Sequence, residues 1–185
     1  MEVSTEAMEL LDSMQGGKVA VTAFCGTSDT GKSFLANRYL DRMQGFKQRS
    51  LLGSGTRGIY LWSQPVPVGN EVQCLILDCQ GLSQFDPTSA SDSSEVEEKL
   101  FTLATLLASQ MVFNTKGHIT DQTMDELSIL PLLASKIRIR GDLAKGENDG
   151  EDEEDLSSDE EGEAAEFYKY FPQFNWVVHD LDMDF

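Results

Sequence analysis

The feature that most constrains the fold of this chain is a short segment, GTSDTGKS, at residues 26–33. It matches the pattern G-x-x-x-x-G-K-[ST], and the apolar run KVAVTAFC leads directly into it. A chance match in a chain of 185 residues has a probability on the order of 1%. Between a strand and a helix, this pattern predicts a loop whose backbone N–H groups and helix N-terminus bind phosphate. The simpler alternative is a glycine turn that only caps a helix.

The side chains of this loop suit a nucleoside triphosphate with Mg²⁺. Lys32 can reach the β- and γ-phosphates, and the hydroxyl of Ser33 is a ligand type for Mg²⁺. The other residues expected to bind the nucleotide are the rest of the loop and the residue that follows it: Gly26, Thr27, Ser28, Asp29, Thr30, Gly31 and Phe34.

Three further candidates follow the loop along the chain. Asp78 and Gly81, in DCQG after the apolar run CLIL, could hold Mg²⁺ through water and bring a backbone N–H to the γ-phosphate. Thr56, in a glycine-rich loop, could complete the Mg²⁺ shell and respond to the γ-phosphate. Asp180, after an apolar run, could accept hydrogen bonds from N1–H and the 2-amino group of guanine, which adenine lacks. Each signal is weak alone, since loop acids and glycine turns are common, and each is stronger behind the phosphate-binding pattern.

Strands and helices are expected to alternate along the chain. Apolar runs predict strands at 18–25, 59–62, 72–77, 111–114 and 174–178, and helical spacing predicts helices at 1–14, 32–43, 95–109 and 121–137. This alternation predicts an α/β fold with a mainly parallel central sheet, the first strand at its centre and helices on both faces. We expect an N-terminal helix within 1–17, packed on the sheet, and a nucleotide-binding domain at 18–185.

The charge of the chain is strongly acidic but unevenly distributed. The net charge is −18, and residues 147–163 hold 11 of the 32 acids with no Lys or Arg. Like charges repel, which predicts a disordered, solvated insert at about 140–165. The shortage of clustered basic residues argues against a nucleic-acid partner. No apolar run approaches the roughly 20 residues of a membrane helix, and three cysteines without a disulfide pattern favour a cytoplasmic setting.

Taken together, these segments resemble the guanylate-binding-protein and atlastin branch of the dynamin-like large GTPases. The resemblance covers about 18–184 and is carried by FCGTSDTGKSFLANRYL, LLGSGTRGIYLWSQPVP, LILDCQGL, FTLATLLASQMVFNTKGHITDQTMDEL and FPQFNWVVHDLDMDF. It implies a Ras-like P-loop GTPase domain that binds GTP and GDP and uses Mg²⁺. It also implies that two such domains pair across the nucleotide face.

The resemblance assigns roles to residues by position. The implied catalytic residues are Lys32, Ser54 and Thr56, with Ser54 helping to place the attacking water. The implied Mg²⁺ ligands are Ser33, Thr56 and Asp78. His179 and Asp180 match the guanine motif of the family, and the chain stops shortly after them, so we expect a domain that is incomplete at its C-terminus.

Three positions depart from the family pattern. Asp29 stands where the family carries an arginine finger, which contributes about 10³ to 10⁵ to the rate of related GTPases. Gln80 replaces an acid of the second switch, and His179 replaces the arginine of the guanine motif. The first interpretation is therefore a GTPase domain that hydrolyses GTP slowly. The alternatives are a non-catalytic module that pairs with active relatives, and an ATP-using P-loop enzyme, against which Asp180 argues.

Overall fold

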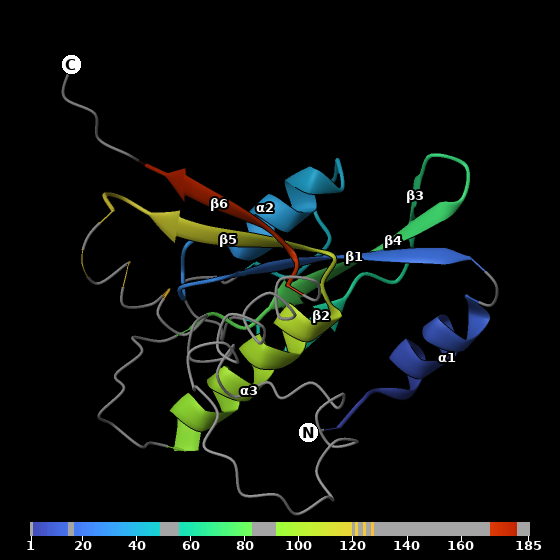
Figure 1. Ribbon diagram of the computed structural model, residues 1–185, viewed down its shortest axis with the longest axis horizontal. Helices are drawn as coiled ribbons and strands as arrows, with labels where there is room; N and C mark the ends of the chain where they lie inside the picture. Colours follow the sequence, from blue (N-terminus) through green and yellow to red (C-terminus); the bar gives the residue numbers. More distant parts are fainter. Residues whose placement is uncertain are drawn as a thin grey trace, which may run out of the picture.

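The computed structural model describes residues 2–14, 17–48, 56–82, 92–119, 121, 124, 127 and 171–180. Their elements, in chain order, are α1 (Thr5–Ser13), β1 (Lys18–Gly26), α2 (Lys32–Tyr39), β2 (Ile59–Leu61), β3 (Val66–Val68), β4 (Val72–Cys79), α3 (Asp92–Leu107), β5 (Gln110–Lys116) and β6 (Gln173–His179) (Figure 1). All five expected strands form. Asp121, Met124 and Leu127 are helical, and the rest of the helix expected at 121–137 lies outside the described residues, as does the acidic insert at about 140–165.

The strands form one mixed sheet with β1 at its centre. The order is β2-β4-β1-β5-β6, and β3 also pairs with β4. β1 is parallel to β4 and to β5, and β5 is parallel to β6. The expected α/β fold with a mainly parallel sheet is confirmed. The carboxyl ends of four strands consequently meet at one edge of the sheet, where ligands of open α/β folds bind.

β3 is the one strand among the described residues that the sequence analysis missed. The sequence analysis expected no strand between 59–62 and 72–77, but Pro67 lies within β3 and faces Gln73 of β4. Proline has no N–H to donate, so it is compatible with a short edge strand. Both β2 and β3 run antiparallel to β4, which makes this side of the sheet mixed.

Helices cover both faces of the sheet, as expected. Alternate residues of β1 point to opposite faces. Ala23 packs in a core with Phe101 and Ala104 of α3, and Phe24 packs in a second core with Ala36 of α2. Figure 1 shows α2 and α3 on opposite sides of the strands. None of the described helices is long and apolar enough to cross a membrane.

The N-terminal helix does not pack on the sheet, and this expectation was wrong. Ser4 caps α1 by accepting a hydrogen bond from the Ala7 N–H at 3.2 Å. The helix has no buried residue, and Met8 and Leu11 remain about half exposed, at 54% and 49%. The faces beside β1 are already occupied by α2 and α3.

Candidate functional site

The loop between β1 and α2 is held against the segment that follows β4. The Ser28 N–H donates to the Leu82 carbonyl at 2.9 Å, and the Leu82 N–H donates to the Gly26 carbonyl at 3.0 Å. Gly26 has φ +127°, and a Cβ there would lie 2.3 Å from the Asn114 carbonyl oxygen. Glycine is therefore required where the loop leaves β1. Gly31, at φ +81°, then begins α2 as its N-cap residue.

The side chain of Lys32 is buried inside this loop. It is 7% exposed, and its Nζ donates to the Thr27 carbonyl at 2.6 Å. Burial lowers the pKa of Lys32, and the nearby Asp78 carboxylate opposes that shift. An ammonium has three donors, so one bond to Thr27 leaves capacity for phosphate oxygens. A Cβ at Gly81 would lie 2.5 Å from the Ser28 Cα and 2.8 Å from Lys32 Nζ, and because the Ser28 contact is with the main chain, only glycine lets the chain after β4 pass this close.

Three side chains that the sequence analysis named as Mg²⁺ ligands converge beside Lys32. Ser33 Oγ donates to Asp78 Oδ2 at 2.7 Å, Thr56 Oγ1 donates to the same oxygen at 3.0 Å, and the two hydroxyls are 3.3 Å apart. They come from α2, the start of the 56–82 segment and β4. Asp78 is fully buried, and burial raises its pKa although Ser33 and Thr56 both stabilise its charged form.

This cluster fits a magnesium ion. Hydroxyl and carboxylate oxygens are the hard ligands that Mg²⁺ prefers. The second carboxylate oxygen of Asp78, Oδ1, is buried without a hydrogen-bond partner among the described residues. An unpaired buried carboxylate oxygen is costly, and a cation or its bound water would relieve that cost.

Gln80 ties together the two segments that carry Thr56 and Asp78. The Gly58 N–H donates to Gln80 Oε1 at 2.8 Å, and the Gln80 N–H donates to the Gly58 carbonyl at 2.8 Å. The main-chain bond extends the pairing of β2 with β4 by one position. The sequence analysis named Gln80 only as a departure from the family and missed this tie, which depends on a contact across 22 residues.

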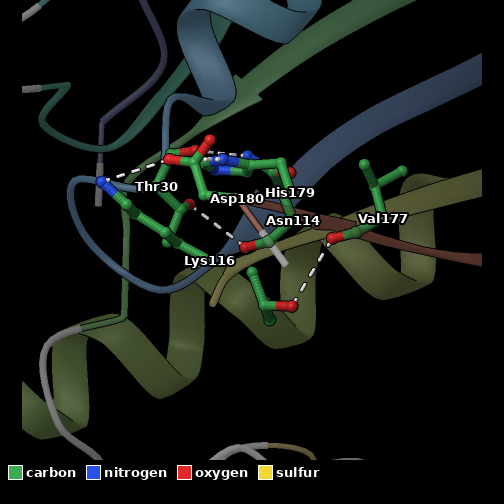
Figure 2. A network of polar contacts seen from close by, with 7 residues as sticks. Thr30, Asn114, Lys116, Val177, His179 and Asp180 are labelled. Carbon is green, nitrogen blue, oxygen red and sulfur yellow. Dashed lines mark hydrogen bonds and ion pairs between the residues drawn. The ribbon is translucent and has the colours of Figure 1, made fainter. Parts of the chain in front are cut away.

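The two residues that the sequence analysis matched to a guanine motif, His179 and Asp180, lie at the carboxyl end of β6. His179 Nε2 is 2.6 Å from the Thr30 carbonyl oxygen, and His179 Nδ1 is 3.4 Å from Asp180 Oδ2. Lys116, at the end of β5, places its Nζ 3.4 Å from the same carboxylate oxygen (Figure 2). Asp180 is exposed, and its hydrogen bond with Lys116 lowers its pKa. The sequence analysis gave no role to Lys116 or Asn114, although both lie in one of the segments that carry the family resemblance.

The remaining candidates differ in their surroundings. Asp29 is exposed with φ +62°, a left-handed conformation that Asp and Asn tolerate better than most residues. Phe34 is 49% exposed, and the Arg38 guanidinium lies over its ring at 5.0 Å. Thr30 is buried. Ser54 lies outside the described residues, so its expected role is untested.

The sheet, the glycine loop before α2 and the cluster around Asp78 define a P-loop α/β domain with the fold of the GTPases. The family described as guanylate-binding protein, N-terminal domain, matches residues 1–185. The chain belongs to this family.

Individual relatives agree with this assignment. Human guanylate-binding protein 3 is 33% identical over 179 residues, which are 97% of this chain and 27% of that protein. Human guanylate-binding protein 1 is 32% identical over 179 residues, again 97% of this chain and 28% of the relative. The chain thus spans less than a third of the length of the curated relatives it matches.

Among solved structures, a variant of Aquifex aeolicus Era bound to GDP and AlF4⁻ is similar to this chain. The similarity covers 87% of this chain and 51% of that one, with 15% sequence identity and a TM-score of 0.46.

Proposed function

We propose that this chain is a guanine-nucleotide-binding domain that hydrolyses GTP with Mg²⁺. The observation that carries the proposal is the convergence of Ser33, Thr56 and Asp78 next to the buried amine of Lys32, beneath a glycine loop. Asp180 lies at the end of β6, at the same edge of the sheet. The relatives are named for binding guanylates, which supports guanine as the base.

Each group in the site has a proposed part in binding. The Lys32 ammonium and the first N–H groups of α2 would neutralise and orient the phosphates. Asp180 would accept two hydrogen bonds from guanine. Ser33 and Thr56 would hold Mg²⁺ with Asp78 acting through water, and the bound ion would neutralise charge that develops on the phosphates. Ser54 would help to place the attacking water.

Equilibrium binding tests this function. A fluorescent GTP analogue is titrated into the protein with Mg²⁺ and then competed with GTP, GDP, GMP and ATP. We expect displacement by guanine nucleotides, with ATP at least about a hundredfold weaker, because adenine cannot make the two bonds to Asp180. Equal displacement by ATP would favour the ATP-using alternative. Absence of binding by folded protein would favour a non-catalytic module.

We further propose that hydrolysis is slow because Asp29 occupies the position of the family's arginine finger. Replacing Asp29 with Arg is expected to raise the single-turnover rate at least about tenfold, a fraction of the 10³ to 10⁵ that such fingers give. The gain is reduced because the left-handed backbone at φ +62° suits arginine less well than aspartate.

Asp29→Asn is the matched control, because asparagine keeps the backbone preference and removes only the negative charge. If Asp29→Asn accelerates hydrolysis as much as Asp29→Arg, loss of repulsion is the cause and no finger is formed. If neither variant is faster, Asp29 does not limit the rate.

We make two finer proposals, the first from the family assignment and the second from the cysteines. One is nucleotide-dependent pairing of two copies across the nucleotide face. The other is a cytoplasmic location, which is supported by the free, buried thiols of Cys25, Cys74 and Cys79.

A further inference from the structure

The carbonyl oxygen of Thr30, in the phosphate-binding loop, accepts two short hydrogen bonds from neighbouring strands. Asn114 Nδ2, on β5, donates to it at 2.6 Å, and His179 Nε2, at the end of β6, lies at 2.6 Å (Figure 2). A carbonyl oxygen only accepts, so His179 carries a proton on Nε2 in this arrangement. One main-chain atom of the loop is thus held from two strands at once.

The direction of this carbonyl determines the direction of the next N–H. The described residues contain no cis peptide bond, so the Gly31 N–H points opposite to the Thr30 carbonyl. The carbonyl faces β5 and β6, which lie on one side of β1 in the sheet. β4, with the Asp78 carboxylate, lies on the other side. The Gly31 N–H is therefore directed toward the half of the site that contains Lys32 and Asp78.

We propose that Asn114 and His179 are positioning residues that aim the Gly31 N–H at the phosphate chain of a bound guanine nucleotide. His179 precedes Asp180 directly, so the same contact couples the base-binding end of the site to its phosphate-binding end. This inference rests on the proposed function, because it takes a guanosine di- or triphosphate as the ligand.

The burial of Asn114 supports a positioning role. Its side chain is 2% exposed, and its Oδ1 is buried without a partner among the described residues. A residue that served only to fill the core would gain nothing from an amide with one unsatisfied oxygen. The Asn114 side chain contributes to the site through its amide N–H, which donates to the Thr30 carbonyl. Thr30 Oγ1 also donates to the Asn114 carbonyl at 3.1 Å, so the two residues hold each other by main chain and side chain.

Affinity measured against phosphate number tests the positioning role. Dissociation constants for GMP, GDP and a non-hydrolysable GTP analogue are measured with Mg²⁺ for the wild type and for His179→Leu. The leucine side chain has no donor for the Thr30 carbonyl. We expect GDP and the GTP analogue to bind about tenfold more weakly. GMP should change by less than about twofold, because the affected N–H serves phosphates beyond the first.

Two further variants make the result specific. His179→Gln keeps an N–H donor near the position of Nε2 and should restore most of the lost affinity for GDP. His118→Leu removes the other histidine of the chain, which is exposed in the turn after β5, and should leave all three affinities unchanged. A purely structural role for His179 would lower the melting temperature of the nucleotide-free protein without this dependence on phosphate number.

The possible outcomes separate this inference from the proposed function. If His179→Leu weakens GMP as much as GDP, His179 serves the base and the positioning role is wrong. If all three affinities are unchanged, the bond to Thr30 has no effect on the ligand and the inference also fails. If the folded wild type binds none of these nucleotides, the proposed function fails, and this inference fails with it.

Discussion

Replacing Lys32 with methionine is expected to weaken nucleotide binding at least about a hundredfold and to stabilise the nucleotide-free protein. The ammonium supplies buried, charge-assisted hydrogen bonds to phosphate, and loss of one partner of such a buried pair costs about 3–5 kcal/mol. At 1.4 kcal/mol for each factor of ten, affinity for GTP should fall by about 10² to 10³ or more. Methionine has a similar length and no charge to desolvate.

The gain in stability follows from the sign of the pKa shift. Burial lowers the pKa of Lys32 in the folded protein. Between that value and the ordinary 10.5, the unfolded chain binds more protons, so the stability of the free protein rises with pH in this window. Lys32→Met removes this rise and should increase the free energy of unfolding at neutral pH, because desolvation is the largest influence on the Lys32 ammonium.

Urea denaturation and nucleotide titration of the same preparations measure both effects. Lys18→Met is the matched control, because Lys18 lies at the other end of β1 with a 75% exposed side chain and should affect neither quantity strongly. Unchanged GTP affinity in Lys32→Met would contradict the proposed site. Lower stability of the free variant would show that the bond to Thr27 outweighs the cost of burying the charge.

Replacing Asp78 with asparagine is expected to abolish the dependence of GTP binding on Mg²⁺ and to lower hydrolysis at least about a hundredfold. Asp78 supplies the formal negative charge of the cluster it forms with Ser33 and Thr56. A bound metal contributes several kcal/mol to stabilising charge in phosphoryl transfer, and each 1.36 kcal/mol is a factor of ten in rate. Single-turnover hydrolysis across a Mg²⁺ titration measures the change.

The same substitution should stabilise the free protein at neutral pH. Burial raises the pKa of Asp78, so between the ordinary 3.8 and the folded value the folded protein binds more protons than the unfolded chain. The stability of the wild type therefore falls as pH rises through this window, and Asp78→Asn should remove that fall. Asp12→Asn, at an exposed acid of α1, is the control and should leave the Mg²⁺ dependence unchanged. A Mg²⁺ dependence that persists in Asp78→Asn would place the ion elsewhere.

Both substitutions make the same physical point about the site. Lys32 and Asp78 are buried charges that lower the stability of the nucleotide-free protein. We expect them to be kept because they bind phosphate and a cation. Functional sites commonly keep groups that are unfavourable for stability alone. A variant that is more stable and inactive is the expected signature of such a site.

The sequence by itself determined the class of fold and the phosphate-binding loop. These features depend on local patterns: an apolar run, a glycine-rich loop with fixed spacing and a helix within some 20 residues. The parallel arrangement followed from the alternation of strands with helices, and Ser33, Thr56 and Asp78 lie together as their order along the chain suggested.

Only the tertiary structure decided how the ends of the strands are joined around the loop. Asn114 and His179 contact Thr30 across 84 and 149 residues of sequence. Neither hydrophobic periodicity nor a local motif predicts these contacts. Likewise, the low burial of α1 could not be foreseen, because its apolar spacing is that of a packed helix while α2 and α3 already cover the sheet. Local spacing determines which elements form. Which helices cover the two faces of the sheet depends on how all the elements pack together. The strand register that brings distant strand ends together is likewise a property of the folded chain.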